Sequence, residues 1–144
     1  MIDVEAIHAL INSYAQEGLM LARSRSMLYE SLREFTVAEE NGEFLGTGGL
    51  HIIWADLAEI RALALKREAV GKGIGQELVE RLITEARELG IPKVFALTYQ
   101  TQFFTKRGFW LVEKEQMSPK VWKECINCPK FPNCDESAMI RETK

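Results

Sequence analysis

Apolar side chains recur along the chain with two periods, one typical of amphipathic helices and one typical of buried strands. The helical period is seen over residues 4–15 and again over residues 75–89. In the second helix the side chains predicted to face inward are Leu78, Val79, Leu82, Ile83, Ala86 and Leu89. Nearly continuous apolar runs at residues 60–65 and 93–98 predict two buried strands.

Local signals predict where the helices begin and end. Asp3 precedes the first helix as its expected N-cap, and Ser26 can cap a second helix that reaches about residue 33. Gly90 follows the long helix at the position where a left-handed residue often ends a helix. The chain therefore opens with helices, ahead of any strand.

A tight turn is expected at Asn41-Gly42, because Asn-Gly between two apolar runs is a strong signal for a β-hairpin. The strands of this hairpin are predicted at residues 35–39 and 44–54. His51 lies in the second strand, where we expect it to have a structural role.

The remaining pattern predicts a mixed sheet. A short helix is expected at residues 101–106, and further strands at residues 109–113 and 138–141. The strand–helix–strand order over residues 60–98 implies a parallel pair of strands. The predicted fold class is α/β (α+β), with a central mixed, twisted sheet flanked by helices.

Between the strand at residues 60–65 and the long helix lies Val70-Gly71-Lys72-Gly73-Ile74-Gly75, with three glycines at alternate positions. Glycine lets the backbone turn tightly and approach a ligand closely. The helix that begins here directs its unpaired N–H groups and the positive end of its dipole toward the loop. This combination is typical of a phosphate site. A flexible strand-to-helix turn would explain the same glycines, and the loop alone does not decide between the two.

Spacing excludes two better-known phosphate loops. The loop of the nucleotide hydrolases requires GxxxxGK[ST], which this chain lacks. The dinucleotide fingerprint requires GxGxxG, and here the third glycine, Gly75, comes one residue early.

Composition narrows the class of protein. The chain has 144 residues, of which 47% are hydrophobic and 27% charged, and its net charge is −3. This length predicts one domain, residues 1–144, with its own core. An acidic chain without a long basic run argues against nucleic acid as a partner. The sequence has neither an apolar run long enough to span a membrane nor a signal-peptide pattern, so we expect a cytoplasmic protein.

The segment AEIRALALKREAVGKGIGQELV resembles the central motif of the GNAT (Gcn5-related) N-acetyltransferases. The resemblance implies the GNAT fold, with the family's first strand missing or truncated here, and a loop that binds the pyrophosphate of acetyl-CoA. Family members usually open this loop with Arg or Gln, where this chain has Val70. The contacts are implied for backbone amides, which Val70 retains. The implied acetyl-CoA contacts are Leu63, Ala64, Leu65, Val70, Gly71, Lys72, Gly73, Ile74, Gly75 and Phe104.

A second segment, TYQTQFFTKRGF, resembles the late helix and strand of the same family. Many members carry there a Tyr that can protonate the departing thiolate, whereas this chain has Phe104. That general acid is therefore not carried over. Tyr99 is nearby in sequence, but nothing in the sequence places its hydroxyl.

A narrower resemblance rests on ARS, VAEENGE, GGLHIIWADLAEIRALAL and the tail W-x-x-C-x-x-C-P. Together these segments are similar to the short amino-acid N-acetyltransferases related to N-acetylglutamate synthase. The resemblance implies acetylation of an amino-acid α-amine, with L-glutamate as the expected acceptor, the first step of arginine biosynthesis. Guanidinium groups grip carboxylates, so Arg23 and Arg61, with Ser24 beside Arg23, are the predicted acceptor-binding residues.

Glu59 is the candidate base. An α-amine is mostly protonated at neutral pH, so a group in the site must remove a proton before the amine attacks the thioester. Glu59 matches the position where related acetyltransferases place a carboxylate on the central strand. The alternative is a simple ion pair with Arg61, two residues along the same strand face. The resemblance also implies that amides near Leu63 and Leu65 polarise the acetyl carbonyl.

Other interpretations stay open. The protein could acetylate another small amine or a peptide N-terminus, or it could bind acetyl-CoA without catalysis, and a homodimer is left open. Cys125, Cys128 and Cys134 could supply three zinc thiolates, but a fourth ligand is missing nearby. A reduced cysteine cluster is therefore preferred, and no metal is expected.

Overall fold

The computed structural model describes residues 3–20, 22–113 and 136–143. They form one six-stranded sheet in the order β1-β2-β3-β4-β6-β5. The helices are α1 (Val4–Ala15), α2 (Arg25–Glu30), α3 (Ile74–Glu88) and α4 (Thr101–Lys106). The strands are β1 (Phe35–Glu40), β2 (Glu43–Trp54), β3 (Leu57–Leu65), β4 (Lys93–Thr98), β5 (Trp110–Val112) and β6 (Ser137–Glu142), and Leu32–Glu34 and Arg67–Ala69 form short 3-10 turns.

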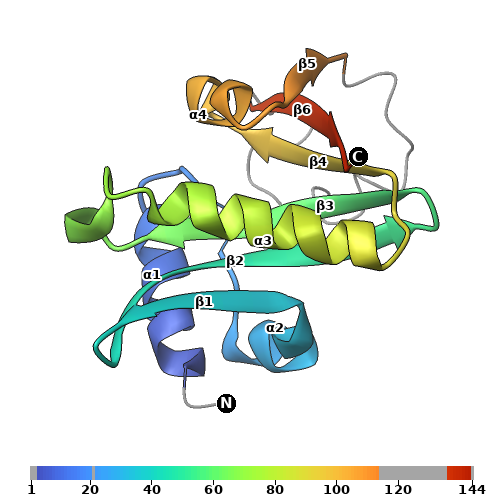
Figure 1. Cartoon of the computed structure of the whole chain (residues 1–144). Coiled ribbons are helices and arrows are strands. Elements are labelled where there is room, and N and C mark those ends of the chain that lie inside the picture. Colours follow the sequence, from blue (N-terminus) through green and yellow to red (C-terminus); the bar gives the residue numbers. More distant parts are fainter. Residues whose placement is uncertain (1–2, 21, 114–135, 144) are drawn as a thin grey trace.

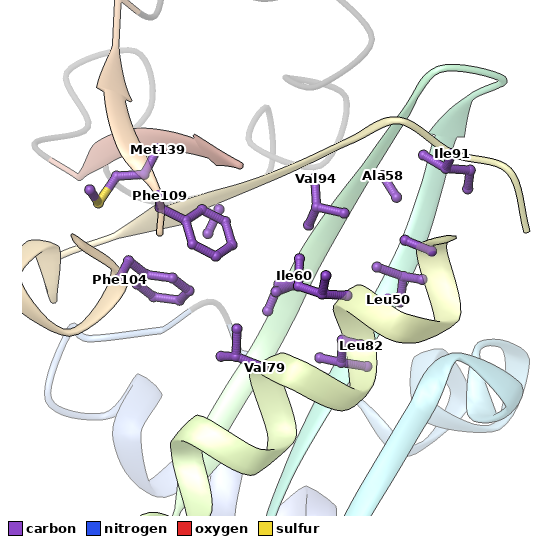
Figure 2. Packing of buried hydrophobic residues seen from close by; sticks show 13 residues of the cluster. Leu50, Ala58, Ile60, Val79, Leu82, Ile91, Val94, Phe104, Phe109 and Met139 are labelled. Carbon is purple, nitrogen blue, oxygen red and sulfur yellow. The ribbon is translucent and has the colours of Figure 1, made fainter. Parts of the chain in front are cut away.

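Helices cover both faces of the sheet. Figure 1 shows α3 in front of the strands and α1 behind them. The core under α3 joins Leu50, Ile60 and Leu82 to the aromatic pair Phe104 and Phe109, as Figure 2 shows. A second buried cluster lies under α1, and its members are Val4, Ile7, Ile11, Leu28 and Phe44. The predicted mixed sheet flanked by helices is confirmed, and α1 is the first described element of the chain.

Two predicted turns are confirmed in detail. Asn41 and Gly42 have φ values of 54° and 79° and join β1 to β2. Both values lie in the left-handed region that the tightest hairpin turn requires. At the end of α3, the Ile91 N–H donates to the Ala86 carbonyl (2.9 Å) and the Gly90 N–H to the Arg87 carbonyl (3.0 Å). These two bonds, with Gly90 at φ 79°, make a Schellman ending.

Other details of the sequence prediction are wrong. Ser24, rather than Ser26, caps α2, because its hydroxyl accepts a hydrogen bond from the Met27 N–H at 3.1 Å. The helix also ends earlier, at Glu30, and a separate 3-10 turn follows it. Asp3 occupies the N-cap position of α1, but its side chain makes no capping bond. Leu89 is 55% exposed, since α3 has ended at Glu88 and the turn at Gly90 brings Ile91 into the core in its place.

The sheet divides between β3 and β4. These two strands run parallel, and their pairing covers Leu57 to Lys93, Ala58 to Val94 and Glu59 to Phe95. Beyond Glu59, β3 keeps its partner β2, while β4 continues beside β6 as far as Thr98. Figure 1 shows the two strands separating toward the glycine-loop end of α3. The edges of β3 and β4 therefore face each other beyond Glu59 without ladder hydrogen bonds between them. This opening between the two strands is the fork.

None of the helices in the described ranges is both long and apolar enough to cross a membrane.

Candidate active site

Glu59 occupies the point where the fork closes. It belongs to the last residue pair that joins β3 to β4, and only 7% of its surface is exposed. The Glu59 Oε1 atom accepts a hydrogen bond from Arg61 Nε at 2.7 Å. The side chains of Arg61 and Glu59 are 14% and 9% exposed, so this ion pair is largely desolvated. The predicted pairing of Glu59 with Arg61 is confirmed, and a base at Glu59 stays a prediction.

The two faces of β3 carry different chemistry. Ala58 and Ile60 belong to the core under α3. Because side chains alternate along a strand, Glu59 and Arg61 point to the opposite face, on which α1 lies. The same strand therefore contributes apolar packing on one side and a buried charge pair on the other.

A β-bulge interrupts β3 directly after Arg61. Arg61 pairs with Gly49 and Ala64 pairs with Thr47, so Ala62 and Leu63 together lie opposite Gly48. Ala62 has φ 56°, a left-handed conformation that is strained for a residue with a Cβ. Since the pairing with β4 ends at Glu59, the fork-side edge of β3 has no ladder partner in this stretch, and the bulge changes the direction of its backbone groups. Amides here can therefore serve a ligand in the fork. Polarisation of an acetyl carbonyl by the Leu63 and Leu65 amides stays a prediction.

Arg23 is held by a clamp on its backbone. The Asn12 side chain in α1 donates to the Arg23 carbonyl at 2.9 Å and accepts from the Arg23 N–H at 3.1 Å. Asn12 also donates to the His8 carbonyl, at 2.8 Å. Arg23 lies in the segment that joins α1 to α2, the linker, and is only 9% exposed, which is unusual for an arginine. Since α1 lies on the Glu59 face, Arg23 is on the same side of the sheet as Glu59 and Arg61.

Neighbours of Arg23 have other roles. Ser24, a predicted acceptor contact, caps α2 with its hydroxyl. Arg25 pairs at the surface with Glu5, with its Nε 2.7 Å from Oε1, and this hydrogen bond lowers the pKa of Glu5. Sequence reasoning missed Asn12, although an amide in the middle of an amphipathic helix is a usable signal for a tertiary hydrogen bond.

The glycine loop connects β3 to α3, and its three glycines have separate functions. Gly71 and Gly73 have φ values of 89° and 81°, and a Cβ at either position would meet no atom within 4 Å. Gly75 instead packs against Phe103, whose ring atoms would lie 3.3 Å from a Cβ. The first two glycines therefore shape an open loop, while the third admits an aromatic ring against the helix.

The loop has the properties of an anion site. Val70 is 60% exposed, and Gly71, Lys72 and Gly73 are exposed as well. Gly73 is the N-cap of α3, and the first main-chain bond of the helix is donated by Glu77 to the Gly73 carbonyl at 3.2 Å. The N–H groups before Glu77 have no partner inside the helix and point out of its positive end.

A side chain of α1 holds the end of β3, from which the chain continues to the glycine loop. The Tyr14 hydroxyl donates to the Leu65 carbonyl at 2.7 Å. The Arg67 guanidinium lies over the Tyr14 ring, 4.5 Å from its centroid, and pairs with Glu17. Thus α1 holds the linker with Asn12 and the end of β3 with Tyr14.

The aromatic residue at position 104 cannot provide an acid, because Phe has no ionisable group. Phe104 is 4% exposed and packs edge-to-face with Phe103 and Phe109, at centroid distances of 5.1 and 5.0 Å. It belongs to the core under α3, and its contact with acetyl-CoA stays a prediction. Tyr99 is half-buried and makes an interaction of its own.

His51 has a carboxylate partner, with its Nδ1 2.8 Å from Glu34 Oε2. The predicted cysteine cluster at Cys125, Cys128 and Cys134 lies outside the described residues. Within the ranges that the structure describes, no group of His, Cys, Asp or Glu side chains could hold a metal ion.

A forked sheet, a bulged central strand and a glycine loop that opens a helix define the class of this protein. The chain belongs to the acetyltransferase (GNAT) family, whose model matches residues 4–109.

Two relatives extend the similarity over most of the chain. The chain is 41% identical to an uncharacterized N-acetyltransferase of Chlorobaculum tepidum, over 96% of this chain and 90% of that protein. It is 40% identical to an amino-acid acetyltransferase of Mycobacterium tuberculosis, over 85% of this chain and 71% of that protein.

Two solved structures share the fold at high similarity. A Mycobacterium tuberculosis protein in complex with CoA and the ligand NLQ has a TM-score of 0.85 at 35% identity, covering 97% of this chain and 93% of that one. The N-acetylglutamate synthase of Neisseria gonorrhoeae, in complex with CoA and N-acetylglutamate, has a TM-score of 0.88 at 29% identity. The match covers 99% of this chain and 33% of the synthase, so this chain spans about a third of that relative's length.

Proposed function

We propose that this protein transfers the acetyl group of acetyl-CoA to the α-amine of a free amino acid, with L-glutamate as the acceptor, and so performs the first step of arginine biosynthesis. The observation that carries the proposal is the fork between β3 and β4. It has an anion-binding loop at its open end and a buried, charged cluster at the point where it closes. The relatives named amino-acid acetyltransferase or N-acetylglutamate synthase support the same reaction.

Acetyl-CoA is assigned to the fork. Its pyrophosphate binds the backbone amides of residues 70–75, where the glycines leave open space and the α3 dipole favours negative charge. The pantetheine arm runs along the edge of β3, past Leu63 and Leu65. The thioester carbonyl accepts hydrogen bonds from amides at the bulge, which stabilises the oxyanion of the tetrahedral intermediate.

The acceptor is assigned to the α1 face of the sheet. Arg23 and Arg61 are buried or nearly so, and their guanidinium groups suit the two carboxylates of glutamate. Glu59 takes a proton from the α-ammonium, directly or through water, and the neutral amine then attacks the thioester. The tetrahedral intermediate collapses and expels the thiolate; the attacking nitrogen loses its second proton in this step, and that proton ends on the thiolate as CoA leaves.

A substrate panel tests this proposal. Acetyl-CoA turnover is measured by thiol release with glutamate, glutamine, lysine, a neutral amino acid, a short peptide and a polyamine. The expected result is the highest kcat/KM for glutamate, because only a dicarboxylate engages both arginines. Comparable turnover of glutamate, lysine and the neutral amino acid would exclude a pocket built around a side-chain carboxylate. Preferred turnover of the peptide or polyamine would change the acceptor class, and tight acetyl-CoA binding without any turnover would make the chain a binding module.

A further inference from the structure

The reaction creates a proton-transfer problem at the closed end of the fork. An ammonium acceptor and a thioester become an amide, a thiol and one free proton, so each cycle must release one proton to solvent. This inference rests on the proposed function, in which Glu59 receives that proton. Glu59 is only 7% exposed and is paired with Arg61. A buried carboxylate needs a group that returns its proton to water before the next turnover.

His51 is placed to be that group. It is the cross-strand partner of Glu59 in the antiparallel β2–β3 pair. Partners in such a pair point to the same face, with their Cβ atoms about 4.5–5.5 Å apart. Among the described residues, the hydrogen bonds of these two side chains go to Glu34 and to Arg61, so a proton passes between the imidazole and the carboxylate through one bridging water. Leu50, the neighbour of His51 in β2, belongs to the core under α3, which places His51 on the α1 face.

Glu34 orients the imidazole ring and connects it to the surface. Glu34 ends the 3-10 turn before β1, and its Oε2 is 2.8 Å from His51 Nδ1. The side chains of His51 and Glu34 are 33% and 32% exposed, whereas that of Glu59 is 9% exposed. A hydrogen bond from Nδ1–H to a carboxylate leaves Nε2 as the proton acceptor. His51 and Glu34 are thus equally exposed, and both are far more exposed than Glu59.

We infer that His51 and Glu34 form a proton relay that carries the proton of the acceptor ammonium from Glu59 to solvent. The ammonium N–H bond breaks and the Glu59 carboxylate gains the proton. The proton then passes to His51 Nε2, and the resulting imidazolium, which Glu34 stabilises, releases it to water. No oxidant, metal or further reactant is needed, and each group returns to its starting state.

The other charged groups around His51 are compatible with this path. On the α1 face, β3 contributes Glu59 and Arg61. Glu34 comes from the 3-10 turn that precedes β1, where it lines a surface hollow with Arg33 and with Glu85 of α3. The residues that α1 buries against the sheet are the apolar Val4, Ile7 and Ile11.

The test uses His51→Gln in the whole chain and measures kcat/KM against pH, with the acceptor that the wild type uses best. The expected loss is roughly tenfold or more near neutral pH, below the effect of removing a direct base. The loss should shrink as pH rises, because hydroxide and buffer can accept the proton. Added imidazole should restore activity to His51→Ala, whose small side chain leaves the partly exposed ring position open. The control is His8→Gln, which removes the only other histidine and should show neither effect.

Glu34→Gln gives an independent measurement should His51→Gln fail to fold. It should lose activity in the same pH range without rescue by imidazole, because the His51 ring still fills the position. Wild-type kcat/KM at every pH in Glu34→Gln would overturn the relay. A pH-independent loss in folded His51→Gln, or the absence of imidazole rescue in folded His51→Ala, would also overturn it. Absence of acetylation by the wild type with every acceptor would instead refute the proposed function on which the relay rests.

Discussion

Two regions around the fork, the glycine loop and the α1 face of the sheet, recognise their proposed ligands in different ways. On the loop side, residues 70–73 are exposed, and the groups that face a ligand are main-chain amides. On the α1 side, Glu59 is 7% and Arg23 9% exposed, and the groups that face a ligand are side chains. A backbone site tolerates changes of residue type as long as the glycine geometry remains. A side-chain site depends on each charged group and on the contacts that hold it.

This difference predicts where substitutions act. Changes on the α1 side should alter turnover or acceptor binding and leave acetyl-CoA binding intact. Changes in the loop should weaken acetyl-CoA binding and leave acceptor binding intact. The size of this effect should depend on charge and backbone geometry more than on side-chain identity.

The largest effect is expected for Glu59→Gln, which keeps the shape and the contact with Arg61 but removes the basic carboxylate. We expect kcat at neutral pH to fall on the order of 10²-fold or more. Raising the pH should recover part of the rate, because more of the acceptor amine is then neutral in solution. A pH–rate profile checks this, with thermal unfolding to confirm that the variant is folded. An unchanged profile would leave Glu59 with the ion-pair role alone.

A smaller effect is expected for Arg23→Lys, which keeps the charge but removes the planar guanidinium. Losing one charge-assisted hydrogen bond costs about 1.5–3 kcal/mol, or roughly ten- to hundredfold in kcat/KM for glutamate. The KM for acetyl-CoA should hardly change. Arg25→Lys is the matched control, because Arg25 pairs with Glu5 at the surface. Equal behaviour of the two variants would remove Arg23 from the acceptor site.

In the loop, Gly73→Asp places a negative charge beside the proposed pyrophosphate. The KM for acetyl-CoA should rise on the order of tenfold. Gly73→Asn is the uncharged counterpart, and Asn and Asp tolerate positive φ similarly well. The difference between the two variants therefore measures the effect of charge apart from backbone strain. Gly42→Asp is the distant control, because Gly42 has φ 79° and, like Gly73, open space around its Cβ. Normal acetyl-CoA affinity in a folded Gly73→Asp protein would show that the loop is only a turn.

The smallest effect is expected for Asn12→Ala, which removes the clamp on the Arg23 backbone. Two hydrogen bonds to the Arg23 backbone are lost, each worth about 0.5–1.5 kcal/mol. Because the Arg23 side chain remains, we expect only part of this loss, roughly a two- to tenfold rise in the KM for glutamate. The KM for acetyl-CoA should stay constant, because the third bond of Asn12 is made within α1, to the His8 carbonyl. Ser13→Ala removes a hydrogen bond made within α1 and serves as control. A rise in both KM values would mean that Asn12 stabilises the fold in general.

Much of the fold follows from local pattern. The Asn41-Gly42 turn, the ending of α3 at Gly90 and the buried face of α3 were all predicted, because each depends on residues close together in sequence. The cap of α2 was misplaced by two residues, since Ser24 and Ser26 are chemically equal and only the observed geometry selects Ser24. The exposure of Leu89 was missed because the helical period does not indicate that α3 ends at Glu88 and that Ile91 enters the core after the turn.

The sequence by itself determined the elements, their order, the glycine loop and the neighbouring pair Glu59 and Arg61. These features depend on backbone preferences and on spacing along one segment. Only the tertiary structure decided that the sheet opens after Glu59, that His51 lies opposite Glu59, and that Asn12 holds Arg23. Such relations depend on strand register and on hydrogen bonds between segments far apart in the chain. A shift of one residue in register would turn every side chain of a strand to the other face, so the site exists only in the folded protein.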